Sequence, residues 1–268
     1  MLALLSAGGA KGVSETLDLA LEEITVPVAG LSPVLDGFRI VALSDFHFLP
    51  YTQIGFLKRA IGVANALKPD LVVLLGDFVD ATVESIHELA PALATLDARH
   101  GVMAVLGNHD HRKGPGVVRD ALAGQGIELL QNRGILLPGG HQGLYVAGTD
   151  SLSGGFSLKE ALQGNVFGAT AVLLAHEPDV ADYVSEHGAV ALQLSGHSHG
   201  GQVRCGGIER LLLPRGGRKY AFGSYKVGNL FLHTSRGLGT TGLPLRLGSE
   251  PEVTLLTLRA APGSEAAG

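Results

Sequence analysis

Two spacings of apolar positions run along the chain, and together they predict a layered α/β protein. Continuous apolar runs of strand length occur at "FRIVALSD" from Phe38 and at "DLVVLLGD" from Asp70. Between them, "IGFLKRAIGVANALK" (54–68) has the 3.6-residue spacing of an amphipathic helix, so the three segments predict a βαβ unit. "ESIHELAPALATL" (84–96) predicts a second helix despite Pro91, and "GVMAVLGNHD" (101–110) predicts a third strand.

Apolar runs in the second half of the chain predict five more strands, at "GLYVAGTD", "TAVLLAHEP", "AVALQLSG", "NLFLHTS" and "EVTLLTLR". We expect the first and the last few of these to pair antiparallel. The sequence shows no internal repeat with a solenoid or propeller period. We therefore expect one main domain over residues 38–260, preceded by a lead-in (1–37) and followed by a small polar tail (261–268) that is disordered.

Side chains that bind metals or transfer protons follow five of the predicted strands. In chain order they are Asp45 and His47, Asp77 and Asp80, Asn108 and His109, His176, and finally His197 and His199 within the glycine-rich stretch "GHSHGG". Each alone is typical of a polar turn. Because open α/β sheets bind ligands at the carboxyl ends of their strands, we expect these side chains to lie together.

The ligand types in this set favour two metal ions over one. Seven of the side chains offer a carboxylate, amide or imidazole ligand, namely Asp45, His47, Asp77, Asn108, His176, His197 and His199. One four-coordinate ion uses fewer. We expect two divalent ions roughly 3.5–4 Å apart with Asp77 between them, and manganese, iron and zinc all suit these ligands. Such a site attracts anions, and transfer of a phosphoryl group to water is the reaction that it suits.

Composition excludes several other classes of protein. Twenty basic residues against 25 acidic residues give a net charge of −5, without a basic run, so we expect no nucleic-acid partner. The single Cys205 excludes an intramolecular disulfide and a cysteine-rich zinc module. The start, "MLALLSAGGAKG", is expected to form neither a membrane span, which needs about 20 apolar residues, nor a complete signal peptide. We expect a cytoplasmic protein, while a lost upstream anchor and the oligomeric state stay open.

Five short blocks together resemble the signature of the calcineurin-like metallophosphoesterase superfamily: "DFH", "GDFVD", "GNHD", "AHEP" and "GHSHGGQ", from Asp45 to Gln202. The resemblance implies an α/β fold in which a mixed two-sheet β-sandwich is flanked by helices, and it makes 38–260 the catalytic domain. It also implies two metal sites that share Asp77, one completed by Asp45, His47 and His199 and the other by Asn108, His176 and His197.

The same resemblance implies that His109 contacts the phosphoryl group and protonates the leaving oxygen, oriented by Asp80. A histidine hydrogen-bonded to a carboxylate is held in one tautomer and can transfer a proton near neutral pH, which agrees with this role. We expect Asp110 to brace the loop. His111 and Arg112 follow directly, and they either line the substrate pocket or belong to the ordinary surface and packing residues.

Missing residues argue against two branches of the superfamily. Serine/threonine phosphatases carry an arginine and a glycine after the second block and an arginine before the asparagine, where this chain has Ala81, Thr82 and Leu106. Purple acid phosphatases have a tyrosine at the position of Asp80. We therefore expect neither a protein phosphatase nor a purple ferric enzyme.

The C-terminal third resembles a bacterial membrane-associated branch that includes UDP-2,3-diacylglucosamine pyrophosphatases of lipid A biosynthesis, through "LQLSGHSHGGQ", "SRGLGTTGLPLRLG" and "PEVTLLTL". Leu211, Leu212 and Leu213 are flanked by Arg210, Arg215, Arg218 and Lys219. An exposed apolar triplet among cations predicts peripheral contact with an anionic membrane or with an acyl chain. The alternative is an ordinary hairpin packed on the sheet.

We therefore expect a dinuclear phosphoester or phosphoanhydride hydrolase with a phosphorylated small-molecule, nucleotide-linked or glycolipid substrate. One alternative is a soluble phosphodiesterase or phosphomonoesterase of small molecules with no membrane role. A second is a non-enzymatic metal-binding scaffold, and a nuclease is a third that the composition disfavours.

Overall fold

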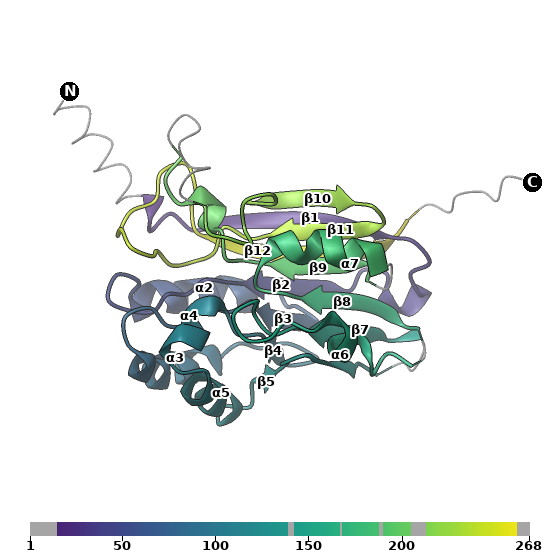
Figure 1. Ribbon diagram of the computed structural model, residues 1–268, viewed down its shortest axis with the longest axis horizontal. Coiled ribbons are helices and arrows are strands. Elements are labelled where there is room, and N and C mark those ends of the chain that lie inside the picture. Colours follow the sequence, from purple (N-terminus) through teal and green to yellow (C-terminus); the bar gives the residue numbers. More distant parts are fainter. Residues whose placement is uncertain (1–14, 139–141, 167, 188–189, 205–212, 262–268) are drawn as a thin grey trace, which may run out of the picture.

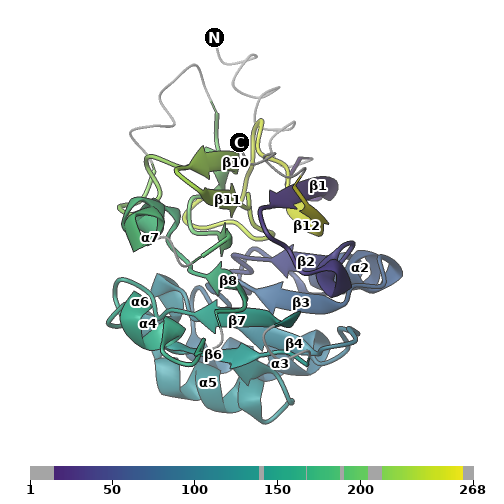
Figure 2. The same ribbon diagram turned by 90° about the vertical axis from the view of Figure 1, so that its right-hand side faces the viewer.

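The computed structural model describes residues 15–138, 142–166, 168–187, 190–204 and 213–261, and within them two six-stranded sheets face each other (Figures 1 and 2). The first sheet has the order β1-β12-β2-β3-β4-β5, with β1 (Ala20–Val28), β12 (Glu252–Ala260), β2 (Arg39–Leu43), β3 (Leu71–Leu74), β4 (Val102–Ala104) and β5 (Glu128–Leu129). The second has the order β10-β11-β9-β8-β7-β6, with β10 (Gly223–Val227), β11 (Leu230–Thr234), β9 (Leu192–Ser195), β8 (Thr170–Leu174), β7 (Leu144–Gly148) and β6 (Arg133–Leu136).

Helices cover the outer face of each sheet (Figures 1 and 2). The helices along the first sheet are α2 (Ile54–Ala66), α3 (Ile86–Leu93) and α5 (Pro115–Ala123), and those along the second are α6 (Leu158–Leu162) and α7 (Ala181–His187). The short α4 (Asn108–Lys113) follows β4. Single-turn 3-10 helices in the described ranges are η1 (Pro33–Leu35), η2 (Val83–Ser85), η4 (Pro178–Val180) and η5 (His199–Gly201). The predicted α/β fold, a mixed two-sheet sandwich flanked by helices, is confirmed.

Alternation along the strands divides the apolar residues between the layers. In β2, Val41 and Leu43 pack against the helices of the first sheet, whereas Ile40 and Ala42 pack between the two sheets. Successive side chains of a strand point to opposite faces, so a strand covered on both sides has to be apolar throughout. This accounts for the unbroken apolar runs that predicted the central strands.

Strand direction is more mixed than we expected from the sequence. The strand β7 pairs antiparallel with β6 but parallel with β8, and β11 pairs parallel with β9 and antiparallel with β10. The last strand, β12, is antiparallel to β2 and parallel to β1. The expected lead-in contributes β1 to the first sheet, because residues 20–28 pair with 252–260, near the other end of the chain.

The carboxyl ends of the central strands of both sheets meet along one edge of the sandwich. The backbone N–H of His47 donates to Asp77 O at 3.0 Å, linking the segments after β2 and β3. The N–H of Gly196 donates to His176 O at 3.0 Å, linking the segments after β9 and β8. The two sheets are joined there by His197 N–H, which donates to Asp45 Oδ1 at 2.9 Å. The topology therefore places all five ligand-bearing loops side by side.

The predicted membrane-contact triplet has no exposed apolar side chain in the described part of the chain. Leu211 and Leu212 lie outside the described residues, and Leu213 is only 5% exposed. Leu213 therefore packs inside the protein and gives the expected membrane contact no support. None of the helices that the structure describes has the length and apolar character to cross a bilayer.

Candidate metal centre

One group of predicted ligands comes from both sheets. Asp45 and His47 follow β2, and His199 follows β9. The Nε2 atoms of His47 and His199 lie 3.0 Å apart, and His199 Nε2 lies 3.7 Å from Asp45 Oδ1. Their three ligand atoms lie within 4.8 Å of one another, and all three residues are buried. The group has the ligand types and the spacing of a metal site.

The second group lies around Asp77, after β3. His176 Nε2 lies 3.3 Å from Asp77 Oδ2, 3.2 Å from His197 Nδ1 and 3.2 Å from Asn108 Oδ1. The Asp77 Oδ2 atom is also 3.4 Å from His47 Nε2 of the first group. One carboxylate oxygen therefore faces both groups.

The outer ring nitrogens of three histidines face oxygens, which leaves their inner nitrogens to bind a cation. His176 Nδ1 lies 2.7 Å from Leu75 O, His197 Nε2 lies 2.9 Å from Arg215 O, and His47 Nδ1 lies 3.3 Å from Asp80 Oδ1. Each of these oxygens can only accept, so the outer nitrogen carries the hydrogen and a neutral ring has its lone pair on the inner nitrogen. Inward lone pairs beside buried carboxylates are the arrangement that metal ions bind.

The charges of the centre favour a cation as well. Burial would lower the pKa of His47, but hydrogen bonds with Asp77 and Asp80 outweigh it and raise the pKa to about 9. Burial likewise opposes a charge on His176, yet Asp77 raises its pKa well above the usual value. Burial and the neighbouring His176 lower the pKa of His197. The carboxylates thus draw positive charge into a buried place, and metal ions would supply it in place of protons.

His109 and Asp80 lie beside the first group. His109 Nδ1 lies 3.2 Å from Asp80 Oδ1, and His47 Nδ1 lies 3.3 Å from the same oxygen. Partial burial would raise the pKa of Asp80, but hydrogen bonds with His109 and His47 outweigh it and hold the pKa well below its usual range. The His109 side chain is 20% exposed, so its second nitrogen can reach a ligand from solvent. All nine predicted site residues therefore meet in one place.

Strained and crowded backbone marks the same loops. Five of the predicted ligands have a left-handed backbone conformation that non-glycine residues rarely adopt: Asp45, His47, Asp77, His197 and His199. Two glycines allow close packing on the carboxylates. A Cβ atom on Gly107 would lie 2.2 Å from Asp77 Oδ1, and one on Gly196 would lie 2.4 Å from Asp45 Oδ2. Backbone strain of this kind clusters at functional sites, where the surrounding structure stabilises it.

Three supporting residues lie around the ligands. The Asp110 carboxylate accepts hydrogen bonds from the backbone N–H groups of Gly107, Asp77, Phe78 and Val79, which confirms its expected bracing role. Ser44 Oγ donates to Asp45 Oδ2 at 2.7 Å. Arg246 is fully buried, donates to Arg236 O and Ser249 O at 2.9 Å each, and has Nη2 at 3.4 Å from His199 Nδ1. The sequence did not point to a role for Ser44 or Arg246: Arg246 lies within "SRGLGTTGLPLRLG", but nothing in that stretch indicates that its side chain reaches His199.

The centre opens into two adjoining cavities. One of about 380 Å³ is lined by Asp77, His109 and His199, with Val203 and Leu243 as apolar walls. Another of about 610 Å³ is lined by Leu152, Ser153, Glu177, Arg215 and Gly216. Both share the residues Asn108, Arg112, His197 and Pro214. His111 is not among the lining residues and instead binds Asp150, with Nε2 at 2.5 Å from Oδ1.

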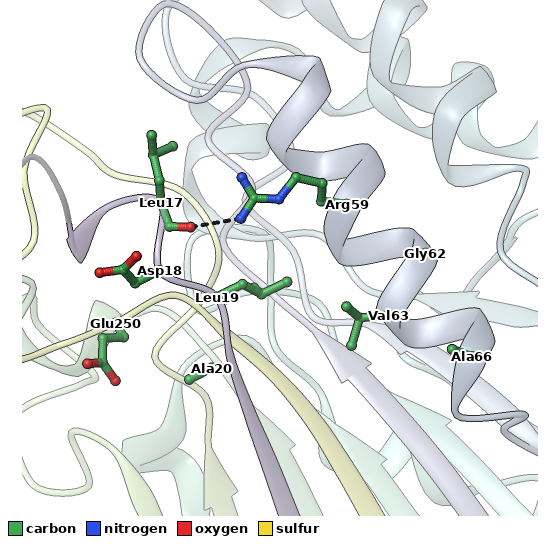
Figure 3. A pocket seen from close by; sticks show the side chains of 9 residues that line it. All are labelled: Leu17, Asp18, Leu19, Ala20, Arg59, Gly62, Val63, Ala66 and Glu250. Carbon is green, nitrogen blue, oxygen red and sulfur yellow. Dashed lines mark hydrogen bonds between the residues drawn. The ribbon is translucent and has the colours of Figure 1, made fainter.

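A separate pocket of about 780 Å³ lies away from the predicted ligands, between residues 17–20 and α2 (Figure 3). Leu19 and Val63 form part of its apolar lining, and Arg59 bridges it by donating to Leu17 O at 2.9 Å. Its carboxylates, from Asp18 and Glu250, point away from the apolar side chains (Figure 3). It holds none of the residues that the sequence singled out.

Comparison with known proteins identifies the family of the chain. A model of the calcineurin-like phosphoesterase family matches residues 38–201, more than half of the chain. The chain is 34% identical over 267 residues to the uncharacterized metallophosphoesterase YkuE of Bacillus subtilis (strain 168), covering 95% of this chain and 92% of that protein. It is 29% identical over 227 residues to phosphodiesterase YaeI of Escherichia coli (strain K12), covering 82% of each. Its fold is similar to that of a 5′-nucleotidase precursor from Thermus thermophilus, with a TM-score of 0.51 and 16% identity over 82% of this chain and 54% of that one. The chain therefore belongs to the calcineurin-like phosphoesterase family and is a metal-dependent phosphoester hydrolase.

Proposed function

We propose that the protein is a dinuclear phosphodiesterase of small, soluble molecules. In this proposal one ion is held by Asp45, His47 and His199, the other is held by Asn108, His176 and His197, and Asp77 is shared between them. The observation that supports it most directly is the position of Asp77 Oδ2, within 3.4 Å of His47 Nε2 and 3.3 Å of His176 Nε2. A single carboxylate oxygen between two groups of inward-facing nitrogens is the arrangement expected of a bridging ligand.

Two bound divalent ions would polarise a phosphoryl group and lower the pKa of a water molecule, which is the chemistry that hydrolysis needs. The chain's own residues hold the reacting groups in place. Asp77 Oδ1 accepts the His109 backbone N–H at 2.8 Å, so the shared carboxylate also fixes the start of α4. Asp110 fixes the Asp77 loop from the other side through Asp77 N and Phe78 N, both at 2.9 Å. A site held this rigidly loses little energy to reorganisation during the reaction.

His109 supplies the proton for the leaving oxygen. Its Nδ1 faces Asp80 Oδ1 at 3.2 Å, which fixes the tautomer and leaves Nε2 as the atom that meets the substrate. With Nδ1 turned to the Asp80 carboxylate, Nε2 is the nitrogen from which a proton can pass to the leaving oxygen. His109 lines the smaller cavity, and the leaving group therefore departs on that side.

The cavities favour a substrate with groups on both sides of the reacting phosphorus. The two cavities meet at Asn108 and His197, the predicted ligands of one ion, so a phosphodiester or phosphoanhydride can extend both ways from that point. The expected glycolipid substrate, such as UDP-2,3-diacylglucosamine, loses the support that Leu213 lent it, because that side chain is buried. Phosphodiesterase YaeI, whose name states a diester activity, is among the similar proteins.

Two alanine variants separate the proposed roles. His109→Ala should keep about two ions per chain and lose most of the turnover of alkyl phosphodiesters, because their leaving groups need a proton. Asp77→Ala should lose the pair of ions and all turnover. His87→Ala, an exposed histidine on α3, is the matched control and should change neither property. Equal loss of metal in His109→Ala and Asp77→Ala would refute this division of roles.

A further inference from the structure

We propose that Arg112 and Arg215 form a subsite for a second anionic group of the substrate, on the part that the enzyme retains after the leaving group departs. The inference rests on the proposed function for the position of the reacting phosphorus. It concerns two arginines that belong to none of the five signature blocks. Both line the larger of the two cavities at the metal centre, the one of about 610 Å³.

Arg112 is placed by the helix that begins at a predicted metal ligand. It lies four residues after Asn108 on α4, and residues four apart share one face of a helix. The Arg112 side chain lines both cavities, as Asn108 does. It therefore lies at the point where the two cavities meet, beside the reacting phosphorus.

Arg215 is placed by the segment that packs on His197. Its carbonyl oxygen accepts the His197 Nε2 hydrogen at 2.9 Å. The adjoining Gly216 has a left-handed backbone, and a Cβ there would lie 3.2 Å from Glu177 Cβ, so the chain is tightly packed at this point. Gly216 O also accepts from the N–H of Asp179 at 2.9 Å. Arg215 is thus held at the rim of the larger cavity by its own backbone, while its side chain is left exposed.

The two guanidinium groups are available for a ligand. Within the described parts of the chain, neither the Arg112 nor the Arg215 side chain has a hydrogen bond or an ion pair, and both residues are exposed. The carboxylate that lines the same cavity, Glu177, is engaged elsewhere. Its Oε1 accepts from Ser151 Oγ at 2.6 Å, and its Oε2 accepts from Leu152 N–H at 3.2 Å.

The position of His109 determines which part of the substrate meets the arginines. His109 lines the smaller cavity and not the larger one, so the leaving group lies in the smaller cavity. The retained group then extends into the larger cavity, towards Arg112 and Arg215. Guanidinium groups bind phosphate in a bidentate manner, so a phosphate or another dianion on the retained group fits this place best.

A matched pair of substrates tests the subsite: thymidine 5′-(p-nitrophenyl phosphate) with and without a 3′-phosphate. Both release p-nitrophenolate, and they differ only in a second phosphate on the retained nucleoside. We expect the manganese-loaded enzyme to prefer the 3′-phosphorylated substrate by about 10- to 100-fold in kcat/KM, mainly through KM, as charge-assisted hydrogen bonds allow. Arg112→Gln and Arg215→Gln should each lower this ratio towards one.

Arg119→Gln is the matched control, because it removes an equal charge from an exposed position on α5 and should keep the ratio. A wild-type ratio near one would overturn the proposal, as would an unchanged ratio in both variants. Loss of turnover on both substrates with the ratio unchanged would also overturn it, since the arginines would then contact the reacting phosphoryl group.

Equilibrium binding separates this proposal from the proposed function. Calorimetry on the manganese-loaded protein should show thymidine 3′,5′-bisphosphate binding at least about tenfold more tightly than thymidine 5′-phosphate, and Arg112→Gln should remove the difference. Neither substrate is hydrolysed in one outcome, yet the wild type still binds the bisphosphate more tightly and Arg112→Gln does not. The hydrolytic function then fails while the subsite stands. If substrates are hydrolysed without such a difference, the subsite fails alone.

Discussion

Asp80→Asn is the perturbation that tests how the two histidines of the centre are held. One oxygen of Asp80 lies 3.3 Å from His47 Nδ1 and 3.2 Å from His109 Nδ1, so the carboxylate orients a predicted ligand and the predicted acid together. Asparagine keeps the size of the side chain but removes its charge, and its NH₂ group cannot accept a hydrogen bond. The substitution therefore weakens both contacts without opening a cavity.

The expected loss follows from the strength of each contact. A hydrogen bond to a charged group contributes about 1.5–3 kcal/mol, and the lower value applies because the Asp80 side chain is 18% exposed. About 1.5 kcal/mol corresponds to roughly a tenfold effect on an equilibrium or a rate. The His47 contact should appear as about a tenfold loss of metal affinity. The His109 contact should appear as about a tenfold loss of kcat at saturating metal.

The two effects are measured separately. Calorimetric titration of the metal-free protein with manganese measures the affinity, and kcat is measured with an alkyl phosphodiester, whose leaving group needs a proton. Asp97→Asn, an exposed aspartate between α3 and β4, is the matched control. An Asp80→Asn protein that binds manganese as tightly as the wild type and has the same kcat would refute the assigned role of Asp80.

Three further changes test the supporting structure. Asp110→Asn should lower the free energy of unfolding by about 3 kcal/mol in urea denaturation, because an amide NH₂ would face backbone N–H donors; an unchanged midpoint would contradict the bracing role. Gly196→Ala should reduce the number of bound ions, since its Cβ would lie 1.8 Å from Ser44 Oγ, whereas Gly62→Ala on α2 meets nothing within 4 Å and should keep them. Burial would raise the pKa of Glu252, but the hydrogen bond with His233 outweighs it and lowers the pKa below 4.5. The stabilisation that this hydrogen bond gives is therefore complete above about pH 4.5 and decreases as the pH falls further. The difference in free energy of unfolding between wild type and Glu252→Gln should shrink in acid. A constant difference from about pH 7 to about pH 3.5 would count against this role of Glu252.

The ligands could be predicted from the sequence because each is encoded locally. Asp45, Asp77 and His176 lie within two residues of the end of an apolar run, and the topology of an α/β sheet brings such positions to one edge. The central strands were predictable for the same reason, since burial on both faces requires an unbroken apolar run. Chemistry that depends on a residue and its place after a strand is therefore visible in the sequence.

What the sequence did not show depends on contacts between distant segments. Arg246 lies 47 residues from His199, and nothing in the stretch around it indicates that its side chain is buried beside that ring. The strand β1 begins "ALEEI", with alternating exposed positions, and it is held by pairing with β12 and by Val26 and Val28, which pack between the sheets. Leu213 follows two other leucines among cations and still packs inside. Whether one apolar residue is buried depends on which other segments the fold brings next to it, and the local sequence does not show this.

The shared role of Asp77 is tested by the number of metal ions per chain, measured together with turnover as metal is added back to stripped protein. Manganese, iron and zinc would each be titrated, with bis-p-nitrophenyl phosphate as the substrate and metal content determined at every point. We expect about two ions per chain, with full turnover reached only when both are bound. Full turnover with one ion per chain, or no bound metal at all, would contradict the shared role of Asp77.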